Sequence, residues 1–162
     1  MKRDLYDRIV AYIVENQNKF YRLAFSYVQN QEDALDAVQN SVCKALEHYG
    51  QIRNEEVIKT WFYRILVNES LKILKERKKI SGNEEEMASL SYEEKGFEIQ
   101  DDLHSHINRL DEDTQKIIKL RFFEELSLKE IAQITELNLN TVKAKLYRGL
   151  KLLKVEIQEV EI

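Results

Sequence analysis

The chain contains no proline and only four glycines in 162 residues, so it lacks the residues that most often break helices and form tight turns between strands. Long stretches instead repeat apolar residues every three or four positions, which is the spacing of one face of an α-helix. Apolar residues make up 43% of the chain, enough for packed cores. We therefore predict an all-α protein of one or two compact helical units.

Acidic residues are concentrated in the middle of the chain. Residues 1–79 hold 14 basic and 11 acidic residues, residues 80–109 hold 2 and 8, and residues 110–162 hold 9 and 10. The acidic stretch is rich in Ser, Gly and Glu without a sustained apolar period, which favours a flexible linker. An alternative is that its carboxylates mimic or repel a nucleic-acid strand. We predict two small helical domains, 1–80 and 103–162, joined by an acidic linker over 81–102.

The sequence gives no indication of an oxidising compartment or a membrane. Cys43 is the single cysteine, so it has no disulfide partner within the chain, and we expect it to be a half-buried packing residue. Charges at Asp4, Asp7, Arg8 and Glu15 interrupt any signal-peptide core, and no apolar run approaches the roughly 20 residues of a membrane span. We expect a cytoplasmic protein.

We also expect no metal, cofactor or catalytic site. His104 and His106 are two residues apart, so on a helix their rings point about 200° from each other. No cysteine or third histidine is positioned to complete a metal site with them. An enzyme is therefore the weakest of the functional classes considered.

The C-terminal unit has the pattern of two helices joined by a turn. Ser127 and Glu130 form a capping-box sequence that predicts a helix start, and Asn138 is a good N-cap for a second helix. On the second helix, Leu139, Val142, Leu146 and Leu150 fall on one face, and Thr141, Ala144, Lys145 and Arg148 on the opposite one.

That division suits a recognition helix, because one face anchors to a scaffold while a small, basic face reaches base edges and phosphates. Lys143, on the flank, favours phosphate contacts. The alternative is an ordinary helical hairpin with a solvated basic face. Glu136 occupies the turn, where many such motifs place Gly, so the sequence leaves the turn conformation open.

In the N-terminal unit, helical stripes predict core faces for the first helices. They contain Leu5, Ile9, Tyr12, Ile13, Phe20, Leu23, Ala24, Tyr27 and Val28. The next helix is expected to direct Leu35, Val38, Val42 and Leu46 inward and to leave Asp36, Gln39, Asn40, Lys44 and Glu47 outward. Its polar face is either plain surface or a partner site.

A helix predicted from about Glu55 to Lys79 carries an aromatic and basic stripe beside its core face. The stripe contains Trp61, Arg64, Asn68, Lys72, Lys75 and Lys79. Trp can stack on an unpaired base, Asn can hydrogen-bond a base edge, and lysines can follow phosphates, as single-stranded nucleic acid requires. Trp61 could equally be a partly buried core aromatic. Glu69 projects to the core face, and the sequence offers no reason for it.

Taken together, these segments resemble the extracytoplasmic-function sigma factors of bacterial RNA polymerase over nearly the whole chain. "FYRLAFSYVQNQEDALDAVQNSVCKAL" resembles the polymerase-binding segment, with its pattern at Ala34, Asp36 and Gln39. "TWFYRILVNESLKILKERKK" resembles the promoter-melting helix, and "LSLKEIAQITELNLNTVKAKLYRGLKLL" resembles the C-terminal helix-turn-helix. The three in this order and spacing make a strong combined signal.

The resemblance implies a sigma region 2-like helical bundle followed by a sigma region 4-like helix-turn-helix domain. Asp36, Gln39 and Asn40 would bind the clamp helices of the polymerase β′ subunit. The minus-ten promoter element would be contacted by Lys44, Ile52, Arg53, Trp61, Arg64, Asn68, Lys72, Lys75 and Lys79. The minus-thirty-five element would be contacted by Asn140, Thr141, Lys143, Lys145, Tyr147 and Arg148.

The same resemblance implies further partners: the polymerase β flap and an anti-sigma factor, often anchored in the membrane and released by stress. It implies no small-molecule substrate. The competing hypothesis is a stand-alone helix-turn-helix regulator that binds duplex DNA as a dimer, but such a protein would not need the Trp61 stripe.

Three positions depart from the family pattern. Leu110-Asp111 replaces the usual Leu-Pro, although acidic residues here still favour a helix start through the dipole. Lys145 stands where many members have Arg and lacks its bidentate fork. Asn140 replaces a common Gly.

Overall fold

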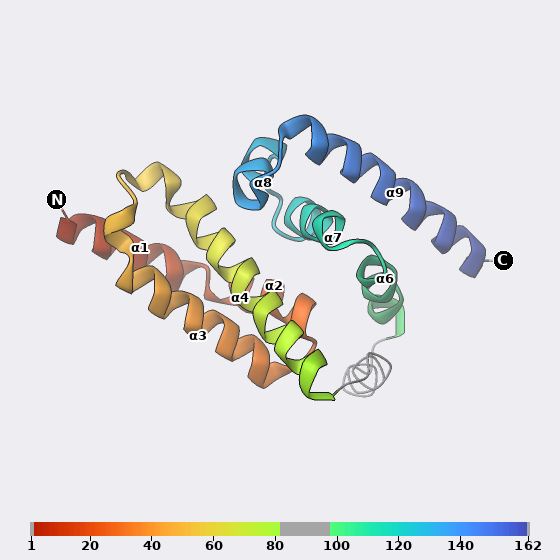
Figure 1. Cartoon of the computed structure of the whole chain (residues 1–162), viewed down its shortest axis with the longest axis horizontal. Helices are drawn as coiled ribbons and strands as arrows, with labels where there is room; N and C mark the ends of the chain where they lie inside the picture. The colour runs from red at the N-terminus through yellow and green to blue at the C-terminus, as the bar shows by residue number, and fades with distance from the viewer. Residues whose placement is uncertain (1, 82–97, 162) are drawn as a thin grey trace. The chain divides into compact units, whose positions relative to one another are not determined.

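The computed structural model describes residues 2–81 and 98–161, and over these residues it contains helices and no strand, which confirms the all-α prediction. The chain divides into two compact units, residues 1–94 and 95–162 (Figure 1). Each unit has its own core. Among the described residues, no helix combines the length and apolarity that a membrane crossing requires.

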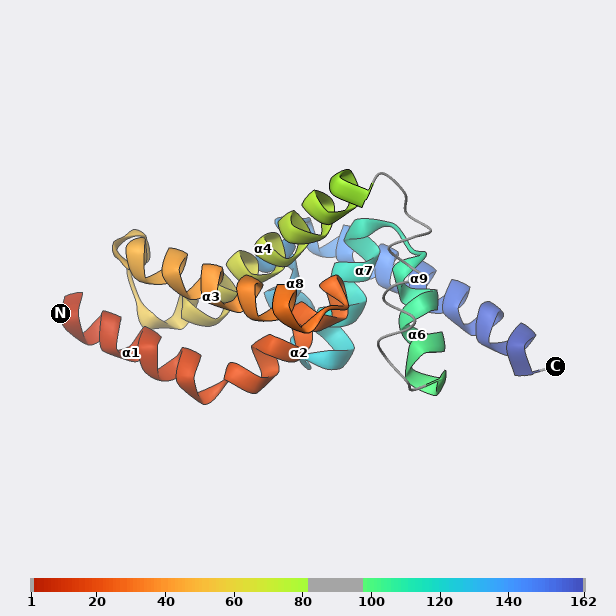
Figure 2. The ribbon, with the colours of Figure 1, turned by 90° about the horizontal axis from the view of Figure 1, so that it is seen from below.

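Over its described residues, 2–81, unit 1 contains long helices and two short 3-10 turns. They are α1 (Lys2–Glu15), α2 (Gln17–Val28), α3 (Gln31–Glu47), η1 (Tyr49–Gln51), η2 (Glu55–Val57) and α4 (Ile58–Ser81). Figure 2 shows α1 and α2 following one another along α3, while α4 packs on α3 in the opposite direction. Asn30 caps α3 by accepting a hydrogen bond from the Asp33 backbone N–H at 2.9 Å.

An aromatic cluster centred on Phe20 forms the core of unit 1. Its ring lies 4.7 Å from Phe62 and 5.5 Å from Tyr63 of α4, measured between ring centroids, and 5.7 Å from Tyr12 of α1. Phe20 and Phe62 are fully buried. Tilted and edge-to-face rings at these separations add to the stabilisation from apolar burial. The predicted stripe of α2 is therefore core, with Leu23, Ala24, Tyr27 and Val28 all buried.

The prediction for the inward face of α3 is wrong. Leu35 is 45% exposed, and Val38, Val42 and Leu46 are only half-buried. The buried face instead carries small side chains, namely Ala34, Ala37, Ser41 and Ala45. Small residues let helices approach closely, so α2 and α4 pack on this face and the larger apolar residues remain at the surface. Apolar spacing alone could not distinguish two adjacent faces of one helix.

Unit 2 contains α6 (Glu98–Asn108), α7 (Glu112–Ile118), a π-helical turn η3 (Lys119–Phe123), α8 (Leu128–Thr135) and α9 (Leu139–Glu161). Helix α6 thus starts inside the range predicted as linker, 81–102. Ser81 is the last residue of α4, and residues 82–97 lie outside the described residues. Helices α6, α7 and α8 each pack on α9. The core contains Ile117, Leu120, Ile131 and Val142, all fully buried.

The local signals at the helix-turn-helix are confirmed. The Ser127 hydroxyl accepts from the Glu130 backbone N–H at 3.1 Å, and the Glu130 carboxylate accepts from the Ser127 N–H at 2.9 Å. The Asn138 side chain accepts from the Asn140 N–H at 2.8 Å at the start of α9. Glu136 ends α8 in the left-handed conformation, at φ 60° and ψ 27°, which is the conformation that Gly usually supplies.

Candidate nucleic-acid and partner interfaces

The aromatic and basic stripe predicted on α4 follows one exposed side of that helix. Asn68, Lys72, Lys75 and Lys79 are exposed, whereas Trp61 and Arg64 are half-buried near the start of the helix. The opposite side of α4 is core, because Ile58, Phe62 and Leu66 are buried. The stripe therefore begins at the partly buried ring of Trp61 and continues along exposed amide and ammonium groups. This arrangement is suited to binding a nucleic-acid strand.

The loop before α4 holds two of the three remaining candidates of the predicted minus-ten set. Asn54 caps η2 by accepting from the Glu56 N–H at 3.0 Å, which orders the entry into α4. Ile52 is buried, with 8% exposure, whereas Arg53 is exposed. In this structure Ile52 thus anchors the loop, and Arg53 is the side chain that solvent can reach.

Glu69 now has a structural explanation. Its side chain is 5% exposed, and its Oε1 lies 2.9 Å from Nζ of Lys44 on α3, whose side chain is 50% exposed. A buried carboxylate requires a partner because desolvation penalises its charge. The ion pair joins α3 to α4 beside Asn68. Lys44, one of the predicted minus-ten contacts, is therefore also a structural partner of α4.

A second ion pair joins the same two helices near the other end of their packing. Arg77 Nη2 donates to Asp33 Oδ1 at 2.8 Å, and the Asp33 side chain is only 9% exposed. This hydrogen bond, followed by the charge of Asp33, raises the pKa of Arg77 above its ordinary value. The two pairs fix the register of α4 against α3. Helix α4 is thus held on α3 by one pair in which it supplies the carboxylate and one in which it supplies the cation, while its outer stripe remains accessible.

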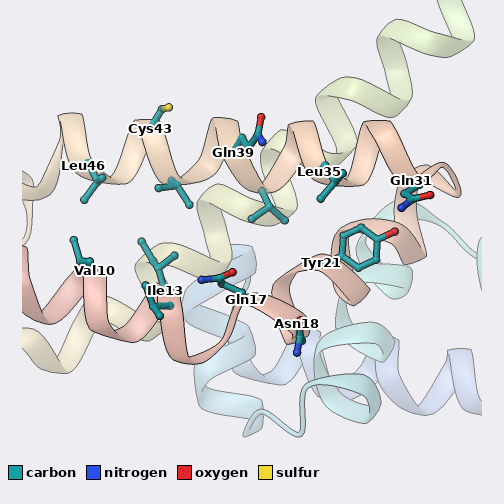
Figure 3. A pocket seen from close by; sticks show the side chains of 13 residues that line it. Val10, Ile13, Gln17, Asn18, Tyr21, Gln31, Leu35, Gln39, Cys43 and Leu46 are labelled. Carbon is teal, nitrogen blue, oxygen red and sulfur yellow. The ribbon is translucent and has the colours of Figure 1, made fainter.

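A groove lined largely by apolar side chains lies between α3 and the α1–α2 segment, with a volume of about 760 Å³. Val10 and Ile13 of α1, Tyr21 of α2, and Leu35 and Leu46 of α3 line it, and Figure 3 shows the α3 leucines directed toward the α1–α2 side. Two of its lining residues, Val14 and Leu35, are 56% and 45% exposed. An exposed apolar groove of this kind suits another protein.

The predicted polymerase contacts lie beside this groove. Gln39 lines it, and Asp36 and Asn40 are exposed on α3 close to Gln39 in sequence. Sequence reasoning identified these polar residues but missed the apolar groove, because it assigned Leu35, Val38, Val42 and Leu46 to the core. The row of Ala and Ser on the neighbouring face was the signal that could have revealed it.

Cys43 is also at the rim of the groove and is exposed, so the prediction of a half-buried packing residue is wrong. Its position follows from the buried face of α3, which contains Ser41 and Ala45 and leaves Cys43 outside. Within the described part of the chain, no group of three or more His, Cys, Asp or Glu side chains is arranged to hold a metal ion.

The second candidate interface is the outer face of α9. Asn140, Lys143, Tyr147 and Arg148 are exposed, Tyr147 by 72%, whereas Thr141 and Lys145 are half-buried. Val142, Leu146 and Gly149 are buried on the opposite side. The expected division into an anchoring face and a basic face is therefore present. The close packing of Gly149 on Thr114 of α7 fixes the orientation of α9 in its unit.

Lys145 differs from its exposed neighbours because its ammonium group lies 3.6 Å from the Asp111 carboxylate. Asp111 caps α7 by accepting from both the N–H and the hydroxyl of Thr114. The Thr114 side chain, with a smaller contribution from the charge of Lys145, lowers the pKa of Asp111 below its ordinary value. The predicted helix start at this departure from Leu-Pro is confirmed.

Comparison with known proteins identifies the family. Residues 12–80 match Sigma-70 region 2, and residues 100–153 match Sigma-70, region 4. RNA polymerase sigma factor SigV of Bacillus subtilis is 45% identical over 155 residues, which cover 95% of this chain and 93% of the relative. The ECF RNA polymerase sigma-E factor of Haemophilus influenzae is 29% identical over 88% of this chain and 83% of its own length.

Solved structures agree in fold. The sigma factor RpoE from Bartonella quintana, in complex with the anti-sigma factor NepR, matches with a TM-score of 0.71 at 19% identity, over 91% of this chain and 95% of that one. CnrH, in complex with the cytosolic domain of CnrY, matches with a TM-score of 0.69 at 18% identity, over 93% and 88%. With the two family regions in order and a 45% identical relative, the chain belongs to the extracytoplasmic-function sigma factors of bacterial RNA polymerase.

Proposed function

We propose that this sigma factor directs core RNA polymerase to specific promoters through three surfaces with separate roles. The α3 surface with Asp36, Gln39 and Asn40, together with the adjoining groove, binds the clamp helices of the polymerase β′ subunit. The α4 stripe binds and opens the minus-ten element, and the outer face of α9 binds the minus-thirty-five element. The subunit itself carries out no catalysis and takes no small-molecule substrate.

The observation that carries this proposal is the α4 stripe on a helix held by two ion pairs. A helix with a core face on one side and Trp61, Asn68 and lysines along the other can stack on a base and follow phosphates at the same time. The Glu69 and Asp33 pairs hold this helix on α3, which carries the proposed polymerase surface. Polymerase could thus position the strand-binding stripe directly.

The apolar groove supports the polymerase assignment. Exposed Val14 and Leu35 would be covered by a partner helix, while Gln39 at the rim could hydrogen-bond to it. The stand-alone regulator is disfavoured because the chain matches a sigma region in each unit rather than in the C-terminal unit alone.

We extend the proposal to regulation. Two solved relatives in fold are complexes, one with an anti-sigma factor and one with the cytosolic domain of a second protein. By analogy, an anti-sigma factor anchored in the membrane holds this chain in the cytoplasm until a stress signal releases it. The polymerase β flap is proposed as the contact of unit 2.

The division of labour is tested by measuring core polymerase pull-down and permanganate reactivity of promoter DNA on the same variants. Trp61→Ala and Asn68→Ala should retain polymerase and lose strand opening. Gln39→Ala combined with Asp36→Asn should lose polymerase. Arg22→Ala, an exposed basic residue on α2, is the matched control and should change neither. Equal loss of both properties in the Trp61 and Asn68 variants would contradict the assignment.

A further inference from the structure

Lys145 and Asp111 form an ion pair on the predicted DNA-binding side of unit 2. The ammonium Nζ of Lys145 lies 3.6 Å from Oδ2 of Asp111, and the lysine side chain is 27% exposed while that of the aspartate is 61% exposed. Lys143 and Arg148, the neighbouring basic residues on α9, are exposed. Among these three basic residues of α9, Lys145 is therefore the one whose side chain pairs with a carboxylate of its own unit.

The aspartate is held in place independently of the lysine. Its Oδ1 accepts from the Thr114 hydroxyl at 2.6 Å, and its Oδ2 accepts from the Thr114 backbone N–H at 3.2 Å. Both bonds belong to the N-cap of α7, so the carboxylate would stay where it is if Lys145 moved away. Lys145, in contrast, has a long flexible side chain that can reach either the carboxylate or a phosphate.

We propose that Asp111 limits the affinity of this sigma factor for DNA by holding Lys145 away from the phosphate backbone. The inference rests on the proposed role of α9 in binding duplex DNA. Sequence-independent affinity comes largely from cations that neutralise phosphates and release counterions. A lysine paired with a fixed carboxylate contributes less of this affinity, because contact with DNA requires the pair to separate.

The functional consequence is that unit 2 binds DNA weakly by itself and depends on polymerase to bring it to the promoter. Residues 126–154 carry 6 basic and 2 acidic residues, so this segment of unit 2 attracts phosphates. Asp111, which precedes the segment and caps α7, pairs with one of these six basic residues and so reduces its attraction for phosphates. Base contacts by exposed residues such as Arg148 are unaffected, so Asp111 lowers the sequence-independent part of the affinity and leaves base recognition in place.

The inference predicts a defined change in salt dependence. Releasing Lys145 adds up to one phosphate contact, which steepens the slope of log affinity against log salt by about 0.9. Between about 50 and 200 mM salt, one such contact changes the ratio of affinities about 3.5-fold. The tighter binding should therefore be largest at low salt.

The test uses the full chain and a fluorescein-labelled duplex of mixed sequence, with fluorescence anisotropy measured across salt concentrations. Asp111→Asn removes the charge and keeps a good N-cap, and Asp111→Ser is a second variant if the first unfolds. Both should bind about 2- to 4-fold tighter at low salt, with a steeper slope. Asp113→Asn removes one charge from the same helical turn and is the matched control for net charge; its effect should be smaller.

Lys145→Gln completes the cycle, because in that background Asp111→Asn should no longer steepen the slope. The inference is overturned if Asp111→Asn weakens binding, matches the Asp113 control, or acts equally without Lys145. Lys143→Gln and Arg148→Gln test the proposed function separately. If neither weakens binding, α9 is not the DNA-binding face, whereas weakening by both with no gain from Asp111→Asn refutes this inference alone.

Discussion

Gly149 packs closely on α7, and replacing it with Ala tests that packing. An added Cβ would lie 2.6 Å from Thr114 Cγ2 and 2.9 Å from Ile118 Cδ1. Carbon atoms in favourable contact are about 3.5–4.0 Å apart, so the helices or side chains must shift by about 1 Å. Such overpacking destabilises a core by about 1–3 kcal/mol.

The same substitution also improves helix propensity, which offsets part of the loss. Ala is favoured over Gly in a helix interior by about 1 kcal/mol. The net expectation is a loss of about 1 kcal/mol in the unfolding free energy of unit 2, or a decrease in Tm of about 4–8 °C for a domain of this size. If propensity dominated, the sign would reverse, so the direction of the change tests the packing geometry.

Thr114→Ser provides a matched compensating variant. It removes Cγ2, the atom closest to the added Cβ, and keeps the hydroxyl that donates to Asp111 at 2.6 Å. In a double-mutant cycle, Gly149→Ala should therefore be less destabilising in the Thr114→Ser background. Gly50→Ala is the control in unit 1, because an added Cβ there meets nothing within 4 Å.

The measurement is thermal unfolding of the full chain by two probes. Far-UV circular dichroism follows both units, and fluorescence follows unit 1 because Trp61 is the single tryptophan. Gly149→Ala should lower the circular-dichroism transition that belongs to unit 2 and leave the fluorescence transition unchanged. Increased stability, or the same loss with Ser at position 114, would refute the reasoning.

Three further predictions concern stability. Glu136→Gly should raise the unfolding free energy of unit 2 by about 0.5–1 kcal/mol, because Gly adopts φ 60° without the steric penalty of a side chain; unchanged or lower stability in circular dichroism would count against this. Lys44→Ala should destabilise unit 1 by about 3 kcal/mol, because it leaves the buried Glu69 carboxylate unpaired, whereas Glu69→Gln removes that charge and should cost about 1 kcal/mol. Fluorescence-detected urea unfolding measures both losses, and a larger loss for Glu69→Gln would contradict this prediction. The lowered pKa of Asp111 stabilises unit 2 at pH values above the unfolded-state pKa of about 3.9, and this stabilisation is lost as the pH falls through the lower folded-state pKa. Asp111→Asn should therefore weaken the pH dependence of the thermal unfolding of unit 2 in this acid range. An unchanged pH dependence would refute the link.

The sequence predicted the helix starts that depend on interactions between residues close together in the chain. Capping by Ser127 and Asn138 depends on side-chain and backbone groups within three residues, so the sequence contains all the information required. The conformation at Glu136 is different, because Glu has no intrinsic preference for positive φ. The turn between α8 and α9 nevertheless adopts it, and the sequence left it open.

The residues of the candidate interfaces were predictable from the sequence, but the ion pairs that some of them form were not. Helical periodicity identified the α4 stripe, yet it could not show that Lys44 pairs with Glu69 or that Lys145 pairs with Asp111. The residues in these pairs come from different helices, so their contact depends on tertiary packing. The groove on α3 was missed for the same reason, since only the positions of α2 and α4 determine which face of α3 is buried.

The most direct test of the promoter-directing role is run-off transcription of fragmented host genomic DNA by purified core polymerase, with and without this chain. The account predicts discrete transcripts that appear only with the chain and that share two short sequence elements upstream of their start sites at a fixed spacing. Trp61→Ala should abolish these transcripts while still binding polymerase. The same transcripts from core polymerase alone, or none with the chain present, would contradict the account.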